Sequence, residues 1–444
     1  MIVMKFGGTS VESREAIQRV AGIVRARIER RPVVVVSAMG KTTNKLLGIA
    51  GAAVRGERDA ALDQLEELRA FHVRESVGVD EEIEAHFAEL GELVRGLAVM
   101  GELTPRATDA ISSYGERISS IIAAEIFRRC GIDAVHLDSR RIIVTDARHT
   151  AAVPNFVETN ARLAAIPKLK GVVVMGGFIA STMDGVTTTL GRGGSDYTAA
   201  IVGAGIGAEE IQIWTDVDGM LTADPTILPG GYRVKTCSFA EAAELAYFGA
   251  KVLHPATVIP AIEKNIPVRI LNSRRPEIEG TLIVAEPPPC ANPIRSIACK
   301  RNITLVNVVS TRMLGAHGFL HRIFEIFDRF ETPVDMLATS EVSVSLTIDN
   351  TRALDAIRAE LEKFADVSIE ENQAIVCLVG DRIRTSPGVA ARVFGAVHDI
   401  NVRMISQGAS LLNISFVMAA AGLKQAVESL HREFFQNPDS NVFE

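Results

Sequence analysis

The sequence lacks the residues that mark disulfide-stabilised, membrane-spanning or nucleic-acid-binding proteins. Its five cysteines are scattered, odd in number and without a Cys-x-x-Cys pair, which disfavours a disulfide framework or a zinc site. No apolar run approaches the roughly 18 residues that a membrane span needs, and no signal-peptide pattern is recognisable. The net charge of −7 disfavours a nucleic-acid partner, which normally shows as a basic domain. We therefore expect a cytoplasmic protein with no membrane or nucleic-acid partner.

The best-known nucleotide-binding motifs are also missing. No Gly-x-x-x-x-Gly-Lys-Ser/Thr loop occurs in the chain. The glycines of residues 203–208 resemble a dinucleotide fingerprint only faintly, because they are expected to end a helix and precede a strand, the reverse of the required order. No Ser-His-Asp or Cys-His arrangement stands out either. A phosphate site in this chain must therefore use another kind of loop.

The first 285 residues predict an α/β fold of three layers, with a sheet between two layers of helices. Short β-branched runs alternate with helical patterns, and several runs are apolar throughout, which indicates a largely parallel sheet buried on both faces. The stretch 46–100 predicts further helices rich in charge. The clearest strands are expected at 2–6, 33–37, 134–137, 171–175, 211–215 and 268–271.

A proline run at 286–289 predicts a domain boundary, because three consecutive prolines continue neither a helix nor a central strand. Beyond this run the chain repeats itself weakly. Each unit is expected to form a strand, a helix that begins after a glycine, two strands and a second helix. We predict one module at 294–372 and another at 373–444, and the two can be interleaved. The repeated residues are Gly318, Arg322, Phe324, Val334, Met336 and Val344, which correspond in that order to Gly388, Arg392, Phe394, Val402, Met404 and Ile414.

Three glycine-rich turns adjoin the predicted strands and helices of the first domain, at 7–8, 176–177 and 191–196. Glycines let backbone N–H groups approach a phosphate closely, because no Cβ intervenes. Ser195 is expected to cap the helix after the third turn, so that the positive end of that helix faces the loop. One glycine pair is usually a plain turn. Three in one sheet, two of them with a basic side chain, predict an anion or phosphate site.

One long helix is expected from Pro105 to Cys130, with Thr104 as its cap and Gly131 at its end. Glu116 lies away from the apolar face of this helix, among small serines that leave room for a ligand. Taken alone, Glu116 is either a solvated surface residue or a clamp for the ammonium group of a ligand.

Five segments resemble aspartate kinases of the amino-acid kinase fold, and the two C-terminal modules look like ACT domains. The resemblance covers essentially the whole chain and implies a three-layer sandwich followed by two ferredoxin-like α+β modules. It also implies ATP-dependent phosphorylation of the side-chain carboxylate of L-aspartate to 4-phospho-L-aspartate, the first step of lysine, threonine and methionine biosynthesis. The five segments are 5–10, 114–117, 187–197, 214–219 and 248–255.

The resemblance further implies a role for individual residues. Those that would meet the transferring phosphoryl group are Lys5, Gly7 and Gly8. Those that would hold aspartate are Thr43, Glu116, Arg192 and Ser195. Those that would line the ATP pocket are Thr215, Asp216, Leu221, Lys251 and Val252. Leu221 and Thr226 stand where lysine-sensitive bacterial members usually carry tyrosine and arginine, and with residues 37–44 they look closer to the plant monofunctional enzymes.

The chemistry of the reaction agrees with this set of residues. The acceptor carboxylate has a pKa near 3.9 and is already ionised, so it needs no general base. It needs positive groups that relieve the repulsion between two anions, and Mg²⁺ bridging the phosphates of ATP. Lys5 and Lys251 suit that role, and Arg192 suits a carboxylate. Asp196 is expected either to organise the cations or only to stabilise its own helix; no metal centre formed by the protein alone is predicted.

The C-terminal modules are expected to bind a ligand rather than to catalyse a reaction. Residues 310–320 and 334–342 resemble the effector-binding part of lysine-sensitive aspartate kinases. Gly318 would let a carboxylate reach the amides at a helix start, and Asp335 and Glu341 would face an ammonium group, unless they are simply exposed acids. The implied effector residues are Met313, Gly318, Leu320, Val334, Asp335, Ser340 and Glu341.

Family members pair these modules across a dimer. We therefore expect a homodimer or homotetramer that is inhibited by lysine, with S-adenosylmethionine as a further candidate effector. An acetylglutamate or uridylate kinase would have no reason to carry the two modules. A catalytically silent amino-acid sensor would be favoured by loss of Lys5 or of the loop 191–196, and neither is lost. A fusion with homoserine dehydrogenase is not expected in a chain of this length.

Overall fold

The computed structural model divides the chain into two compact units. The first contains Met1–Met220, Lys235–Phe239 and Val252–Pro287, and the second contains Leu221–Val234, Ala240–Lys251 and Pro288–Glu444. The structure describes residues 1–249, 255–311, 317–381 and 383–444. Two segments that precede the proline run therefore pack with the C-terminal part of the chain. The domain limits expected from the sequence stay a prediction.

The first unit is built around an eight-stranded sheet in the order β3-β4-β2-β1-β7-β9-β10-β8. Neighbouring strands are parallel except β9 and β10. Every residue of β2 and β4 is buried, as a parallel sheet covered on both faces requires. The strands are β1 (Ile2–Phe6), β2 (Pro32–Val36), β3 (Ala134–Leu137), β4 (Val172–Gly176), β7 (Glu210–Thr215), β8 (Thr236–Ser238), β9 (Val268–Asn272) and β10 (Thr281–Val284); β5 (Ile179–Ser181) and β6 (Thr187–Thr189) form a separate pair.

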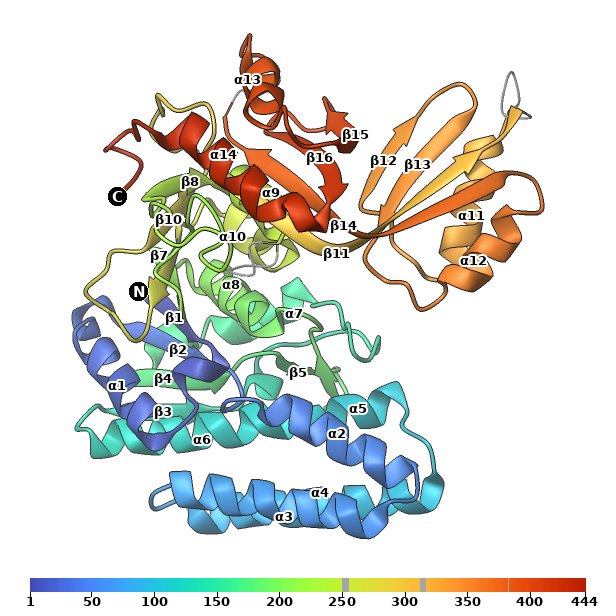
Figure 1. Ribbon diagram of the computed structural model, residues 1–444. Coiled ribbons are helices and arrows are strands. Elements are labelled where there is room, and N and C mark those ends of the chain that lie inside the picture. Colours follow the sequence, from blue (N-terminus) through green and yellow to red (C-terminus); the bar gives the residue numbers. More distant parts are fainter. Residues whose placement is uncertain (250–254, 312–316, 382) are drawn as a thin grey trace. The chain divides into compact units, whose positions relative to one another are not determined.

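Helices cover both faces of this sheet, which confirms the three-layer sandwich (Figure 1). Helix α6 packs against β2, β3 and β4, whereas α8 packs against β1, β2 and β7. Met4 and Phe6 belong to a core shared with α1 and α6. Because side chains alternate along a strand, Lys5 faces the α8 side. The helices of the first unit are α1 (Arg14–Arg25), α2 (Thr42–Val54), α3 (Arg58–Glu75), α4 (Asp80–Met100), α5 (Pro105–Ser112), α6 (Tyr114–Arg129), α7 (Phe156–Leu163), α8 (Gly194–Ile206) and α10 (Ile259–Glu263). Helix α9 (Phe239–Tyr247) belongs to the second unit from Ala240 onward.

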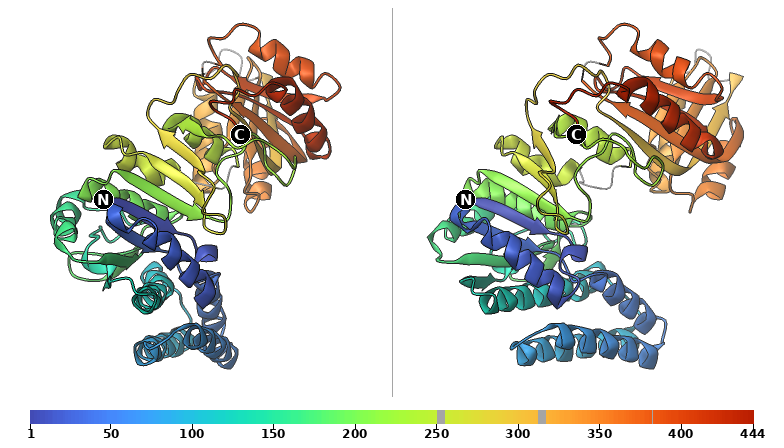
Figure 2. Two further views of the ribbon diagram at one scale, coloured as in Figure 1. Left: turned by 90° about the vertical axis from the view of Figure 1, so that its left-hand side faces the viewer. Right: turned by 60° about the vertical axis from the view of Figure 1, so that its left-hand side comes forward.

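The expected helices of residues 46–100 are α2, α3 and α4, and Figure 2 shows α3 and α4 as a pair that lies away from the sheet. α4 also packs against α6. None of the helices formed by the described residues is long and apolar enough to cross a bilayer.

The single helix expected from Pro105 to Cys130 is wrong, because the structure breaks it into α5 and α6 at Ser113. The hydroxyl of Ser113 donates to the carbonyl of Ala110 at 2.7 Å, and that of Ser112 donates to the carbonyl of Asp109 at 3.3 Å. Such bonds to the preceding turn compete with helix hydrogen bonds and bend the backbone. The expected cap is confirmed, since Thr104 accepts from the backbone N–H of Ala107.

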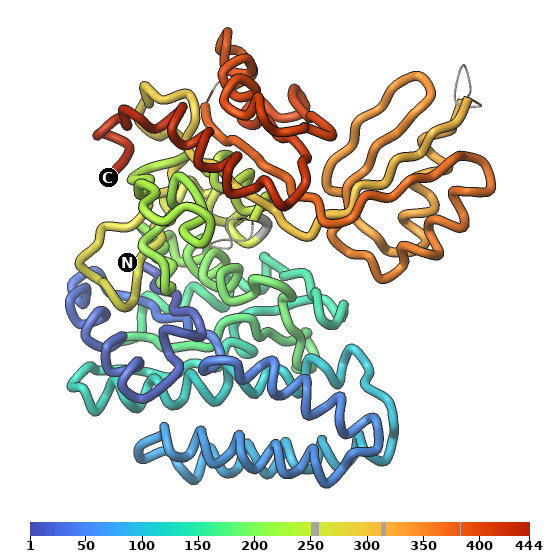
Figure 3. The backbone as a smooth tube through the Cα atoms, in the orientation of Figure 1, coloured from blue at the N-terminus to red at the C-terminus, as the bar shows by residue number. Residues whose placement is uncertain are grey.

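The second unit contains a six-stranded antiparallel sheet in the order β12-β13-β11-β14-β16-β15, and it confirms the internal repeat. Gly318 and Gly388 precede equivalent helices with left-handed φ of +78° and +82°. Strands β11 and β14 pair with each other along their length, so the two modules share one sheet (Figure 3). The elements are β11 (Ser296–Val309), α11 (Phe319–Arg329), β12 (Met336–Thr339), β13 (Ser343–Ile348) and α12 (Leu354–Leu361), then β14 (Asp366–Val379), α13 (Val389–Ala396), β15 (Val402–Gln407), β16 (Asn413–Ala419) and α14 (Leu423–Phe435).

Candidate active site

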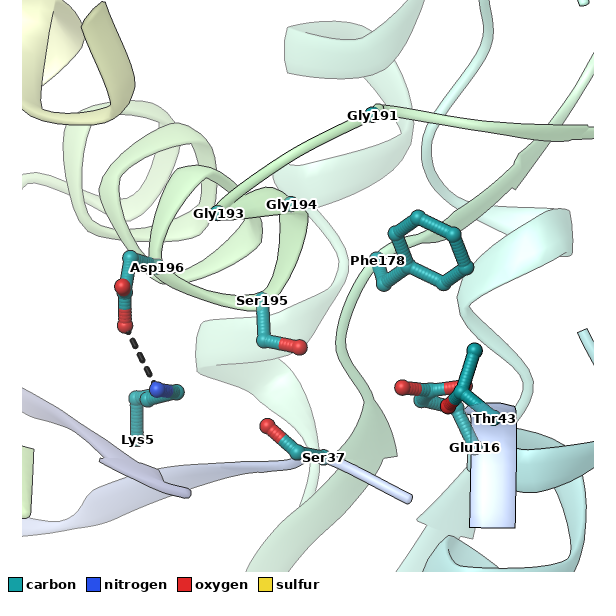
Figure 4. A pocket seen from close by; sticks show the side chains of 10 residues that line it. All are labelled: Lys5, Ser37, Thr43, Glu116, Phe178, Gly191, Gly193, Gly194, Ser195 and Asp196. Carbon is teal, nitrogen blue, oxygen red and sulfur yellow. Dashed lines mark ion pairs between the residues drawn. The ribbon is translucent and has the colours of Figure 1, made fainter. Parts of the chain in front are cut away.

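A pocket of about 290 Å³ lies in the first unit, at the carboxyl ends of β1, β2 and β4 (Figure 4). Ligands of open α/β sheets bind at this edge, because the loops that follow neighbouring parallel strands meet there. Figure 4 shows Ser37 and Ser195 between Lys5 on one side and Glu116 on the other. The lining residues are Lys5, Ser37, Thr43, Glu116, Phe178, Gly191, Gly193, Gly194, Ser195 and Asp196.

Lys5 and Asp196 form an ion pair at the wall of this pocket, with 2.7 Å between Nζ and Oδ1. Both side chains are largely buried, with exposed fractions of 12% and 14%. Oδ1 has no hydrogen-bond partner within the described part of the chain, so the contact is an ion pair rather than a directed hydrogen bond. Lys5 lies near the end of the buried strand β1, and Asp196 belongs to the first turn of α8. The pair is therefore held at a fixed place by a strand and a helix.

Glu116 is buried in the first turn of α6, with only 4% of its surface exposed, and its solvated alternative is wrong. Its Oε1 accepts from the backbone N–H of Ala38 at 3.1 Å. Its Oε2 is buried and has no partner among the residues that the structure describes. Burial raises the pKa of Glu116 to about 8, although the bond from Ala38 and the charge of Lys5 act in the opposite direction. A buried carboxylate with an unsatisfied oxygen is suited to a ligand that brings its own cationic donor.

The glycine loop before α8 differs from the expectation at its cap. The helix begins at Gly194, and its cap is Gly193 with a left-handed φ of +72°, so the expected N-cap role of Ser195 is wrong. The hydroxyl of Ser195 lines the pocket instead. Gly177 is required beside it, because a Cβ there would lie 2.6 Å from the Cβ of Ser195. Arg192, which lies in the same loop, has an exposed side chain.

The buried carboxylate of Asp109 holds the segment that contacts this glycine loop. Asp109 of α5 is fully buried and accepts from Nδ1 of His149 at 2.7 Å, from the backbone N–H of Thr150 at 3.0 Å and from the hydroxyl of Thr189 at 2.5 Å. Thr150 in turn touches the loop, since a Cβ on Gly191 would meet its carbonyl oxygen at 3.0 Å. Asp109 therefore fixes the turn on which the glycine loop rests. Sequence reasoning missed this network, because its members come from three distant segments.

Comparison with known proteins identifies the family. Residues 1–272 match the amino acid kinase family, and residues 306–364 and 376–434 match an ACT domain. Over 464 residues, 98% of this chain and 80% of the relative, the chain is 40% identical to aspartokinase 1, chloroplastic, of Arabidopsis thaliana. Over 452 residues, 98% of this chain and 99% of the relative, it is 39% identical to lysine-sensitive aspartokinase 3 of Escherichia coli (strain K12). The chain belongs to the aspartokinase family.

Solved aspartokinase structures share its fold. A structure of E. coli aspartokinase III in complex with aspartate and ADP (R-state) has a TM-score of 0.85 and 37% identity, and covers 98% of this chain and 100% of that chain. A structure of the same enzyme in complex with lysine and aspartate (T-state) has a TM-score of 0.85 and 36% identity, and covers 98% and 99%. The expected amino-acid kinase fold with C-terminal ACT domains is thereby confirmed.

The other residues expected to bind ATP in this aspartokinase lie at four places in the chain. Gly8 lies at the tight turn after β1, where a Cβ would meet the carbonyl oxygen of Gly40 at 2.7 Å. Thr215 ends β7, and its hydroxyl donates to Asp216 at 3.2 Å. Leu221 and Thr226 belong to the second unit. Two positions, Lys251 and Val252, lie outside the described residues.

Two lining residues were not predicted to belong to the site. Ser37 follows β2 directly, and its position after a buried strand was a usable signal. Phe178 follows the Gly176–Gly177 turn and has an unusual left-handed φ of +65°. A non-glycine residue in that conformation is uncommon and strained, and the local sequence does not predict it.

In the ACT modules, the structure places the expected effector residues at three points. Gly318 and Leu320 lie at the start of α11, and Val334 and Asp335 lie just before β12. The pair Ser340 and Glu341 lies in the turn between β12 and β13 and is exposed, while Met313 lies outside the described residues.

Asp335 is already paired with an ammonium group of the chain itself. Its side chain is 6% exposed, and its Oδ1 accepts from Nζ of Lys300 at 2.6 Å. Lys300 also pairs with Asp349 at 2.8 Å. The second carboxylate oxygen of Asp335 is buried and, among described residues, without a partner. This buried carboxylate therefore already has a cationic partner within the chain.

Proposed function

We propose that this aspartokinase binds L-aspartate in the pocket between Lys5, Glu116 and the glycine loop. The bound aspartate would receive the γ-phosphoryl group of ATP there. The observation that carries the proposal is Oε2 of Glu116, which is buried and lacks a donor among the described residues. The ammonium group of aspartate supplies that donor and a compensating charge. Thr43 and the hydroxyl of Ser195 line the same space and can orient the bound substrate. Arg192 is exposed at the loop, from where its guanidinium would turn onto a carboxylate of aspartate.

Lys5 is proposed to hold the transferring phosphoryl group. Aspartate attacks with a carboxylate that is ionised at neutral pH, so the pocket needs no general base. It needs a cation at the point where the acceptor and the phosphates, all negatively charged, approach each other. Among the described residues, Lys5 is the lysine that lines the pocket. Its ammonium group, now paired with Asp196, would change partner to a phosphate oxygen when ATP binds.

Asp196 fits the Mg²⁺ that accompanies ATP. Mg²⁺ is usually bound by one or two carboxylates together with phosphate oxygens, rather than by an all-protein cage. Oδ1 of Asp196 is a buried oxygen without a hydrogen-bond partner in the described chain, and the described residues form no cluster of three or more metal ligands. Asp196 would therefore hold the ion jointly with the nucleotide. When bound, Mg²⁺ neutralises charge on the phosphates.

The reaction is tested by trapping acyl phosphate with hydroxylamine. We expect ATP-dependent hydroxamate formation from L-aspartate, and none above background from N-acetylglutamate. The absence of aspartyl hydroxamate from folded protein would reject the proposed role of the pocket. Formation from N-acetylglutamate instead would favour a different kinase of the same fold.

We further propose that L-lysine inhibits the enzyme by binding to the ACT modules near Asp335. The support is the buried carboxylate of Asp335, which already binds the ammonium group of Lys300, together with the likeness to an E. coli aspartokinase named as lysine-sensitive. Strands β12 and β15 form the two edges of the shared sheet and also contact each other. An edge strand can pair with a strand of another copy, which fits a homodimer or homotetramer formed through these modules. S-adenosylmethionine as a second effector, and a cytoplasmic location, stay predictions from the sequence.

Lysine titration into the hydroxamate assay tests this regulation. Inhibition at millimolar or lower L-lysine, absent with D-lysine, is the expected result. Full activity at those L-lysine concentrations would reject lysine as the effector, and S-adenosylmethionine is then titrated in the same assay.

A further inference from the structure

A second cavity, of about 330 Å³, lies in the first unit where α4, α6 and β3 meet. It differs from the candidate active site in its lining residues but borders it, because Glu116 and Arg117 are consecutive residues of α6. Figure 1 shows α4 running beside α6 on the side away from the sheet. The lining residues are Glu82, His86, Arg117, Ser120, Ile121, His136, Leu137, Asp138, Ser139, Arg140, Arg141 and Ile179.

The cavity offers cationic donors that are not all occupied. Nε of Arg117 is buried and has no hydrogen-bond partner in the described part of the chain. The rest of its guanidinium contacts Glu89 at 3.4 Å and stacks on the ring of Tyr114 at 4.0 Å. Arg141 lies exposed at the rim. Arg140 contributes less, because its guanidinium is bound to Asp138 at 2.7 Å. A buried donor without a partner is costly, and a carboxylate oxygen would satisfy it.

The same cavity offers acceptors on two imidazoles. Burial lowers the pKa of His86 and of His136, so both rings are neutral at neutral pH. Nδ1 of His86 lies 2.8 Å from the carbonyl oxygen of Glu82, which can only accept, so the ring proton is on Nδ1 and Nε2 keeps a lone pair. Ser120 donates its hydroxyl proton to the carbonyl of Arg117, so it accepts from Nε2 of His136, and Nδ1 of that ring keeps the lone pair. The cavity therefore presents acceptors for N–H groups as well as donors.

We propose that this cavity is a second binding site, for a free α-amino acid. Its carboxylate would bind Arg117 and Arg141. Its ammonium group would be held by the lone pair of His86 and by the carboxylate of Glu82 at the rim. The apolar side chains of Ile121, Leu137 and Ile179 would pack against the side chain of the ligand. A simple anion would use the arginines but leave the acceptors of this cavity without a donor, which is why a zwitterion fits better.

Occupation of this site would alter the affinity of the pocket next to it. Arg117 follows Glu116 on the first turn of α6, so a ligand that fixes Arg117 also restrains Glu116. On the other side, the hydroxyl of Ser139 donates to the carbonyl of Gly176, and a Cβ on Gly176 would meet the carbonyl oxygen of Glu116 at 2.9 Å. Because coupling between two sites is reciprocal, aspartate would change the affinity of the second amino acid by the same factor.

The test uses the full chain and measures binding, so it does not depend on the proposed catalytic function. The proteinogenic amino acids other than aspartate are added one at a time at 10 mM, as is sulfate, and thermal stability is recorded for wild type, Arg117→Gln and Asp335→Asn. Each amino acid that raises the thermal stability of wild type is then titrated calorimetrically. Arg95→Gln is the matched control, since Arg95 is an exposed α4 arginine that pairs with Glu92 and does not line the cavity.

The expected result is at least one amino acid that stabilises wild type, Arg95→Gln and Asp335→Asn, with a dissociation constant at least about tenfold higher in Arg117→Gln. If Arg117→Gln does not fold, Arg141→Gln at the exposed rim replaces it. The proposal is overturned if no amino acid stabilises wild type more than Arg117→Gln. It is also overturned if every stabilising effect disappears in Asp335→Asn. Equal stabilisation by sulfate, also lost in Arg117→Gln, would show a plain anion site and overturn the amino-acid assignment.

Discussion

Nζ of Lys5 lies 2.7 Å from Oδ1 of Asp196 in the pocket at the carboxyl edge of the sheet. The two residues are far apart in sequence, one in the first strand and one in the first turn of α8. Their charges neutralise each other while the pocket holds no substrate. Binding of ATP with its cation would separate the pair, with Lys5 moving to phosphate and Asp196 to the metal ion.

Lys5→Ala should leave a folded protein with kcat reduced at least about a hundredfold, because the cation between the two reacting anions is lost. The hydroxamate assay measures this loss, and circular dichroism checks the fold. Lys170→Ala is the matched control, since Lys170 is an exposed lysine of the same unit. Near-normal turnover in Lys5→Ala would exclude the phosphoryl-holding role.

Asp109→Asn should raise the KM for aspartate while the KM for ATP changes little, because Asp109 positions the turn beneath the glycine loop. Asparagine keeps one acceptor oxygen but places an amide donor against the donors of the network. We expect a cost of about 1–3 kcal/mol in the free energy of unfolding as well. The control is Asp184→Asn in an exposed loop. Equal changes in both KM values would indicate general loss of structure instead of loop positioning.

Lys300→Gln should lower the lysine concentration that gives half-maximal inhibition, because it removes the internal ammonium group that competes for Asp335. Asp335→Asn should weaken inhibition, because it removes the carboxylate itself. Both are read from lysine titrations of the kinase reaction, with the exposed Lys424→Gln as control. An unchanged lysine response in Lys300→Gln would mean that the internal ion pair does not compete with the effector.

Glu116 makes the stability of the ligand-free enzyme depend on pH. Burial raises its pKa from 4.5 to about 8, so the folded state binds a proton that the unfolded state has lost over that interval. The stabilisation linked to this proton is complete below pH 4.5 and is lost as the pH rises through about 8. The unfolding free energy of wild type, measured relative to Glu116→Gln, should therefore fall between pH 5 and 9. A constant difference would show that Glu116 has an ordinary pKa.

Local patterns were sufficient to predict the sheet and the repeat. Apolar β-branched runs located six strands of the first unit to within a residue, whereas β5, β6, β8 and β10 were not predicted. The recurring Gly318 and Gly388 located the first helix of each module in the second unit. Lys5 and Glu116 were predicted from different observations: Lys5 lies beside a glycine turn, and Glu116 lies among serines of a helix. The structure brings both to one pocket.

The features that sequence reasoning missed depend on contacts between distant segments. The support of the glycine loop joins Asp109, His149 and Thr189, and none of these residues carries a signal by itself. The cap at Gly193 depends on a left-handed turn that no side chain specifies, and Ser195 looked like the better cap. Leu221–Val234 packs with the second unit, and contacts of this kind between distant segments cannot be predicted from local sequence patterns.

The most direct test of the aspartate pocket is the proton balance of aspartate binding. At pH 7 the carboxyl group of Glu116 is mostly protonated in the empty pocket, and binding an ammonium group requires its ionised form. Calorimetric titration of L-aspartate into wild type, in buffers of different ionisation enthalpy, should therefore show release of nearly one proton for each aspartate bound. Glu116→Gln should show no such release and an affinity about tenfold or more lower. Proton-neutral binding to wild type, with equal affinity in Glu116→Gln, would contradict the account.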